Sequence, residues 1–140
     1  MKKVSFSKIS IGDEIPELVK KVTLLDLIQY AAATWSLYLL HIDKEFAQNQ
    51  GFKQANIPAS YFGACLTKLV SDWIKDPGQI KKLGYRVIGM SFVDDTLNFK
   101  GKVSKKYQEA GQNFIDYDLW VENQEGVQVA TATATVSLLG

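Results

Sequence analysis

Residues 60–75 carry the pattern that most constrains how this chain can fold. Their large apolar side chains come in adjacent pairs that repeat every four residues, at positions 61/62, 65/66, 69/70 and 73/74. This spacing gives a helix a broad apolar face. Such a face must be covered, so we expect one long, deeply packed helix, ended by the turn at Asp76, Pro77 and Gly78.

The second half of the chain alternates apolar and polar residues, which is typical of strands with one buried face. The expected strands cover residues 83–92, 96–107, 113–122 and 127–139, with turns at 93–95 and 123–126. In the last strand Ala130, Ala132 and Ala134 share a face. Small side chains there let a helix or a ligand lie close to the sheet. Of these two interpretations, we favour close packing of a helix.

The first third of the chain predicts one strand and two helices. A strand is expected at residues 18–22. Thr23, with Asp26 three residues later, resembles a capping box and predicts a buried helix that runs to about Trp35. Asp43 is placed to cap a short helix over residues 44–50.

These elements predict an α+β fold in which a curved antiparallel sheet wraps around one long helix. The length of 140 residues is that of one domain, and we expect a single domain over residues 1–140. The apolar stretch 24–40 is interrupted by Asp26 and Gln29, so we interpret it as a buried helix and its exit rather than a membrane span.

The composition disfavours several classes of function. Sixteen basic and fifteen acidic residues nearly cancel, so a nucleic-acid partner is not expected. The single cysteine, Cys65, forms no internal disulfide and suits a reducing cytosol. The amino terminus lacks the apolar core of a signal peptide, and we expect a cytoplasmic protein. One histidine and one cysteine make no metal site.

The only histidine, His41, lies in the stretch ATWSLYLLHID at residues 33–43. A lone histidine beside leucine and isoleucine is more often a buried, hydrogen-bonded side chain than a catalyst. From these residues alone, packing is the favoured role of His41.

The order of the elements resembles the hot-dog fold, and particular segments resemble the MaoC-like dehydratases, the family of (R)-specific enoyl-CoA hydratases. The similar segments are IGDEIPELVKKVT, DLIQYAAAT, HIDKEFAQNQGF, LTKLVSDW, YRVIGMSFVDDTLNFKGKV and LWVENQEGVQVATATATVSLL. The resemblance implies addition of water to a 2-enoyl thioester, or the reverse dehydration. In the family an Asp and a His five residues later share the proton transfers, and amides at the start of the central helix polarise the thioester carbonyl.

The resemblance assigns the catalytic histidine to His41 and the family's catalytic Asp position to Ser36, which has no carboxylate. Asp43 falls on an acidic helix cap, which we interpret as structural. The family's His-Gly pair falls near Pro58 and Ala59. The resemblance further suggests substrate-binding roles for Tyr38, Leu40, Ala59, Ser60, Gly63 and Arg86; for Arg86 a surface or interface ion pair is the alternative.

The resemblance is compatible with two main functions, and with a third that we rank last. In the first, the resemblance implies a hydratase or dehydratase that acts on an acyl-CoA or acyl-carrier thioester without another cofactor. Alternatively it is a catalytically degenerate subunit that binds an acyl thioester or pairs with an active chain. A hot-dog thioesterase comes last, because no carboxylate is well placed for it. The expected partner is a second hot-dog chain, in a homodimer or a heteromer.

Overall fold

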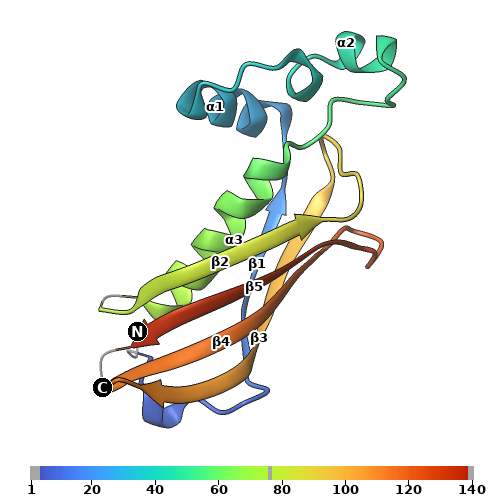
Figure 1. Ribbon diagram of the computed structural model, residues 1–140. Helices are drawn as coiled ribbons and strands as arrows, with labels where there is room; N and C mark the ends of the chain where they lie inside the picture. Colours follow the sequence, from blue (N-terminus) through green and yellow to red (C-terminus); the bar gives the residue numbers. More distant parts are fainter. Residues whose placement is uncertain (1–3, 76, 139–140) are drawn as a thin grey trace.

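The fold is an antiparallel sheet with one long helix against it (Figure 1), seen in a computed structural model that describes residues 4–75 and 77–138. The elements, in chain order, are η1 (Phe6–Lys8), β1 (Glu14–Lys21), α1 (Leu24–Thr34), η2 (Leu39–His41), α2 (Lys44–Asn49), α3 (Ala59–Ile74), β2 (Gln79–Val87), β3 (Thr96–Glu109), β4 (Gln112–Glu122) and β5 (Gln128–Leu138). The α+β expectation is therefore confirmed.

The five strands have the order β1-β3-β4-β5-β2, so β1 and β2 are the two edges of the sheet. The helix α3 lies on one face of this sheet (Figure 1). Its apolar side chains and the inward residues of the strands form one core, with Phe62, Leu66 and Val70 fully buried. The predicted helix is confirmed to within one residue at each end. The turn predicted to end this helix includes Asp76, which lies outside the described residues.

Small residues allow α3 to approach the sheet. Ala130, Ala132 and Ala134 of β5 are buried in the same core as the side chains of α3, as expected for close helix packing. On the helix, a Cβ atom added to Gly63 would lie 2.5 Å from the ring of Tyr85 on β2. The helix therefore crosses β2 at a glycine.

The predicted boundaries of two strands are wrong. The strand expected at residues 18–22 begins at Glu14, because β1 is an edge strand and Pro16 needs no hydrogen-bond partner for its nitrogen. The strand expected at 83–92 covers Gln79–Val87 instead. The amides of Ile88 and Gly89 still donate to the Val129 oxygen of β5, at 2.9 and 3.1 Å. Farther on, Phe92 forms an isolated bridge with Asn56.

The helix α1 begins as predicted but is less buried than predicted. The Thr23 hydroxyl accepts from the Asp26 amide and the Asp26 carboxylate accepts from the Thr23 amide, which completes the capping box. However, the only buried residues of α1 are Leu27 and Ala31, and Trp35 is 82% exposed. The reason is that α1, η2 and α2 lie beyond one end of the sheet (Figure 1).

The segment that contains α1, η2 and α2 (residues 24–49), called the helical excursion below, lies at the end of the sheet where α3 begins (Figure 1). It brings the segment that contains His41 close to the amino-terminal end of α3. Within residues 4–75 and 77–138, no helix has both the length and the apolar character needed to cross a membrane.

Candidate functional site

His41 is the last residue of η2, and both flanking helices are fixed by local capping. The α1 capping box lies before it. After it, the Asp43 carboxylate accepts from the Phe46 amide at 2.8 Å and caps α2. Asp43 is thus used as a helix cap, as the sequence suggested. In the chain, His41 therefore lies between two capped helices.

The His41 ring makes one hydrogen bond that determines which nitrogen carries the proton. Its Nδ1 atom lies 2.9 Å from the main-chain oxygen of Asn56. A carbonyl oxygen can only accept, so in the neutral ring the proton is on Nδ1 and Nε2 keeps its lone pair. The half-buried imidazole therefore presents a proton acceptor that the protein itself has oriented.

Aromatic rings stand beside the imidazole. Tyr38 packs edge-on against His41, with 5.6 Å between ring centroids, and Phe46 packs against Tyr38 at 6.2 Å. Tyr38 is 54% exposed, so this aromatic group is open on one side. Leu40, the residue before His41, is half-buried and accepts the Asn56 amide through its main-chain oxygen at 3.1 Å.

The segment 55–57 connects this group to the start of α3. Asn56 bonds to Leu40 and His41 on one side, and the Ile57 amide donates to the Ser91 oxygen at 2.9 Å on the other. Pro58 then caps α3 without a side-chain hydrogen bond, and Ala59 and Ser60 are exposed. The first amides of a helix lack acceptors within the helix, so they suit an oxygen that gains negative charge.

Three of the predicted site residues lie outside the group of residues around His41. Ser36 is exposed, and its amide donates to the Ala31 oxygen at 3.0 Å, closing α1; the described residues include no hydrogen bond between its hydroxyl and His41. Gly63 packs against Tyr85. Because side chains alternate along a strand, Arg86 next to Tyr85 lies on the face of the sheet away from α3.

Asn56 is a residue of this group that the sequence did not reveal. It is only 7% exposed, and its main chain holds both Leu40 and His41. In the sequence it stands in a polar loop before Pro58, where an asparagine is ordinary. No local signal marks it, because its burial depends on residues about 15 positions earlier and 35 positions later in the chain.

Other reactive groups lie elsewhere. Burial raises the pKa of the Cys65 thiol, which lies on the core side of α3, so this thiol is a poor nucleophile. Among residues 4–75 and 77–138, no three histidine, cysteine, aspartate or glutamate side chains come together as metal ligands.

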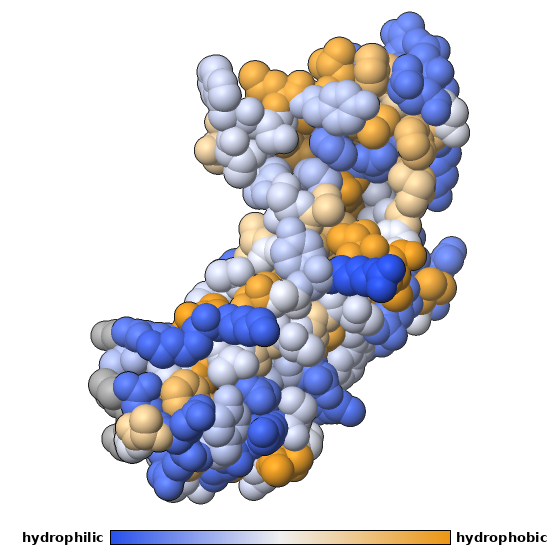
Figure 2. Space-filling view, viewed as in Figure 1, coloured by the Kyte–Doolittle hydropathy of each residue, from blue (hydrophilic) through white to orange (hydrophobic). Residues whose placement is uncertain are grey.

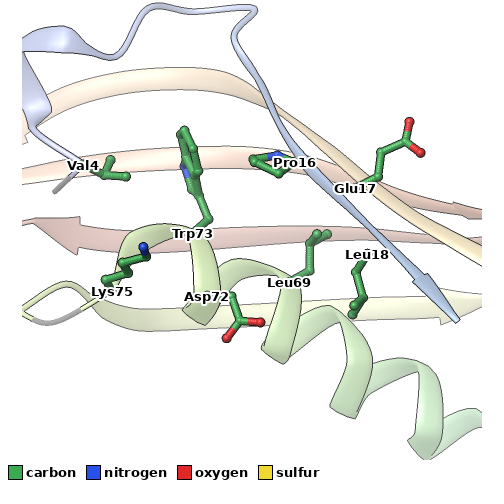
Figure 3. A pocket seen from close by; sticks show the side chains of 8 residues that line it. All are labelled: Val4, Pro16, Glu17, Leu18, Leu69, Asp72, Trp73 and Lys75. Carbon is green, nitrogen blue, oxygen red and sulfur yellow. The ribbon is translucent and has the colours of Figure 1, made fainter. Parts of the chain in front are cut away.

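A separate pocket of about 360 Å³ lies between β1 and the carboxyl-terminal half of α3. Figure 3 shows Trp73, Leu69 and Leu18 around it, with the carboxylates of Glu17 and Asp72 pointing in different directions. Leu69 is ten residues after the start of α3, a distance of roughly 15 Å along the helix. This pocket is therefore distinct from the His41 group. Its lining is Val4, Pro16, Glu17, Leu18, Leu69, Asp72, Trp73 and Lys75.

Apolar side chains are exposed on the helical excursion. Figure 2 shows them gathered over the upper part of the molecule, in the same view as Figure 1. The exposed residues of this segment are Leu24, Leu25, Ile28, Trp35, Leu37, Tyr38 and Leu39. A surface of this kind commonly contacts a ligand or another chain.

Comparison with known families identifies the chain. Residues 8–125 match the family model described as MaoC like domain. The chain belongs to the MaoC-like domain family. The resemblance of the sequence segments to this family is thus confirmed. No curated protein sequence matches the chain significantly.

Solved structures of MaoC-like proteins share the fold. R-hydratase PhaJ1 from Pseudomonas aeruginosa superposes with a TM-score of 0.88 at 18% identity, over 99% of this chain and 92% of that chain. The A. caviae (R)-hydratase involved in PHA biosynthesis gives 0.84 at 16% identity, over 94% and 98%. A chain of the ChsH1–ChsH2 complex from Mycobacterium tuberculosis gives 0.83 at 25% identity, over 93% and 98%. The predicted hot-dog fold is therefore confirmed for this MaoC-like chain.

Proposed function

We propose that this MaoC-like chain adds water to the double bond of a 2-enoyl thioester of CoA or of an acyl carrier, or catalyses the reverse dehydration. One observation carries the proposal. The Nδ1 atom of His41 is bonded to the Asn56 oxygen, which leaves Nε2 free to accept a proton near the start of α3. A base held in this way beside unpaired helix amides suits a reaction that activates water and builds charge on a thioester oxygen.

His41 performs both proton transfers in the proposed reaction. Its Nε2 atom takes a proton from water as the water oxygen bonds to the β carbon of the enoyl group. The electrons of the double bond move toward the thioester oxygen, where amides at Ala59 and Ser60 stabilise the negative charge. His41 then returns the proton to the α carbon, so that one water has been added and the imidazole is unchanged.

The absence of a carboxylate at Ser36 lowers the expected rate. One positioned acid–base group contributes about 10²–10⁴-fold to a rate. A serine hydroxyl does not replace it as a base near neutral pH. We therefore expect a slow hydratase compared with a member of the family that keeps both groups.

We propose that the chain works with a second hot-dog chain, in a homodimer or a heteromer. Both edges of the sheet are unpaired among the described strands, and the edge strand β2 ends at an exposed apolar group, Tyr85, Ile88 and Met90. Such edges and patches favour association with another chain. The Mycobacterium tuberculosis structure is named as a complex of ChsH1 with ChsH2, which agrees with pairing in this family.

The second candidate function is that of a degenerate subunit. The residue that favours it is Ser36, because loss of the acid leaves a site that binds an acyl thioester without turning it over. In that case catalysis would belong to a partner chain that keeps both acid–base groups.

One experiment tests the proposal against this alternative. The purified protein is mixed with a short and a medium 2-enoyl-CoA, and the loss of enoyl absorbance is followed; binding of the saturated acyl-CoA is measured in parallel. Turnover by the isolated protein supports the hydratase. Binding without turnover supports the degenerate subunit, and neither binding nor turnover contradicts both.

A further inference from the structure

The two edges of the sheet differ in how well they are protected against pairing with another chain. On β1, Pro16 has no amide hydrogen to donate, and the register with β3 shifts between Ile15 and Leu18. A proline and an irregular stretch in an edge strand both hinder the addition of a further strand. On β2, residues 82–87 keep a regular register with β5 and include no proline. The free edge of β2 is therefore the better suited of the two to pair with another chain.

The β2 strand is strongly basic. Its sequence is QIKKLGYRV, in which Lys81, Lys82 and Arg86 are exposed and no residue is acidic. The neighbouring strand β5, QVATATATVSL, has no charged residue. Within residues 4–75 and 77–138, Lys82 and Arg86 form no ion pair. Their positive charges therefore act on whatever strand lies next to the free edge of β2.

A second copy of this chain would present the same charges to β2. Lys82, Gly84 and Arg86 share the face of the sheet away from α3, because the residues between them lie opposite buried alanines of β5. In an antiparallel pair with Gly84 opposite its own copy, Lys82 would lie opposite Arg86 of the copy. If Leu83 or Tyr85 lay opposite its own copy instead, Lys82 or Arg86 would lie diagonal to itself, at about 8 Å. Each of these registers brings like charges together.

Exposed apolar side chains continue from this basic edge. Tyr85 is 40% exposed, Ile88 55% and Met90 53%. An edge that is rich in lysine prevents association when that is its only task. Here the edge is combined with an apolar patch, which suits a partner that supplies apolar contacts together with negative charge.

We propose that the free edge of β2 binds a different hot-dog chain, one with aspartate or glutamate on its pairing edge strand, in preference to a second copy of this chain. This choice of partner rests on the pairing with a second hot-dog chain that is proposed above, and it selects the heteromer. Carboxylates of the partner would lie opposite Lys82 and Arg86, because opposite charges across a strand pair attract each other. The charges that attract this partner also disfavour the homodimer.

A copy of the chain with an acidic edge is the probe for this preference. It carries Lys81→Glu, Lys82→Glu and Arg86→Glu and is mixed with the natural chain. Analytical ultracentrifugation measures the dissociation constant of the mixed pair and of each protein with itself. We expect the mixed pair to be at least about 10-fold tighter than the natural chain with itself. Raising the salt concentration from about 0.05 M to about 0.5 M should weaken the mixed pair and strengthen the self-association of the natural chain.

A control copy changes the net charge equally at exposed lysines outside β2. It carries Lys21→Glu, Lys44→Glu and Lys102→Glu. We expect it to bind the natural chain no more tightly than the natural chain binds itself. Circular dichroism verifies the folding of each copy. If the acidic-edge copy does not fold, Lys82→Gln combined with Arg86→Gln takes its place, and this neutral edge should self-associate about threefold or more tightly than the natural edge.

Two results would overturn the proposed partner. In the first, the natural chain associates with itself as tightly as with the acidic-edge copy, which would leave a homodimer. In the second, the acidic-edge copy binds the natural chain no better than the control copy does, as for an edge that only prevents association. No thioester is present in these measurements. A natural chain that does not hydrate 2-enoyl-CoA would therefore contradict the hydratase and leave the choice of partner unchanged.

Discussion

The imidazole of His41 is fixed by a residue 15 positions later in the chain, through a 2.9 Å hydrogen bond from Nδ1 to the main-chain oxygen of Asn56. Because that oxygen belongs to the segment that leads into α3, the same contact sets the position of the ring relative to the start of the helix. A main-chain acceptor cannot be removed by mutation of its own side chain. The orientation of His41 is therefore a property of the fold.

This contact predicts the tautomer of His41. In the neutral imidazole the proton should be on Nδ1, because the Asn56 oxygen accepts it. Nitrogen-15 NMR of the imidazole distinguishes the two tautomers, and the chain has a single histidine, so its signals are unambiguous. A neutral ring protonated on Nε2 would contradict the proposed base.

Restoring the acid at position 36 should increase the rate. Ser36→Asp places a carboxylate at the position to which the sequence resemblance assigns the family's catalytic Asp. We expect the hydration rate to rise by about 10-fold or more, toward the roughly 10²–10⁴-fold that a positioned acid–base group supplies. The matched variant is Ser36→Asn, which has the same shape but exchanges no proton. Equal rates for the two variants would show that position 36 takes no part in proton transfer.

Gly101 on β3 should not tolerate a side chain. A Cβ atom there would lie 2.5 Å from Leu119 and 2.9 Å from Ile15, and both of these side chains are buried. We expect Gly101→Ala to lower the free energy of unfolding by about 1–3 kcal/mol, measured by chemical denaturation. Gly84→Ala is the control, because nothing lies within 4 Å of its added Cβ. A Gly101→Ala protein as stable as the control would mean that the strands β1, β3 and β4 pack more loosely.

The capping box of α1 should make stability depend on pH. The Thr23 amide and hydroxyl donate to the Asp26 carboxylate and hold its pKa below the ordinary value of 3.8. A lowered pKa in the folded state stabilises the protein above the unfolded value, and this stabilisation is lost as the pH falls through the folded value. We expect Asp26→Asn to cost about 1 kcal/mol near neutral pH and progressively less below about pH 4.

Denaturation at several pH values measures this difference. The control is Asp72→Asn, which removes an exposed ion pair with Lys68 at 2.7 Å and should cost only about 0.5 kcal/mol or less. A cost of Asp26→Asn that stays constant from pH 6 to pH 3 would contradict the assigned role of the carboxylate.

Elements specified by local interactions could be predicted from the sequence. The helix α3 has its apolar pairs at a spacing of four residues, and α1 has its capping box within four residues. The errors come from non-local structure. The start of β1 was missed because Pro16 is tolerated only when the strand is at an edge, and the end of β2 was missed because Phe92 pairs with Asn56 rather than with β5.

The candidate site was only partly predictable for the same reason. The position of His41 came from the resemblance to the MaoC-like family, since a lone histidine beside leucines carries no catalytic signal. The contact with Asn56 depends on a three-segment arrangement that no local pattern encodes. Likewise, the exposed apolar side of α1 resembled a core face, because a sequence does not distinguish buried apolar residues from exposed ones.

The most direct test of the central claim is the rate at which the protein hydrates a 2-enoyl-CoA, compared with the rate of His41→Ala. We predict measurable turnover by the natural chain and a loss of at least about 10²-fold in the variant, with both proteins folded by circular dichroism. Equal rates for the two proteins would contradict the role of His41, and the absence of turnover by the natural chain would contradict the proposed hydratase.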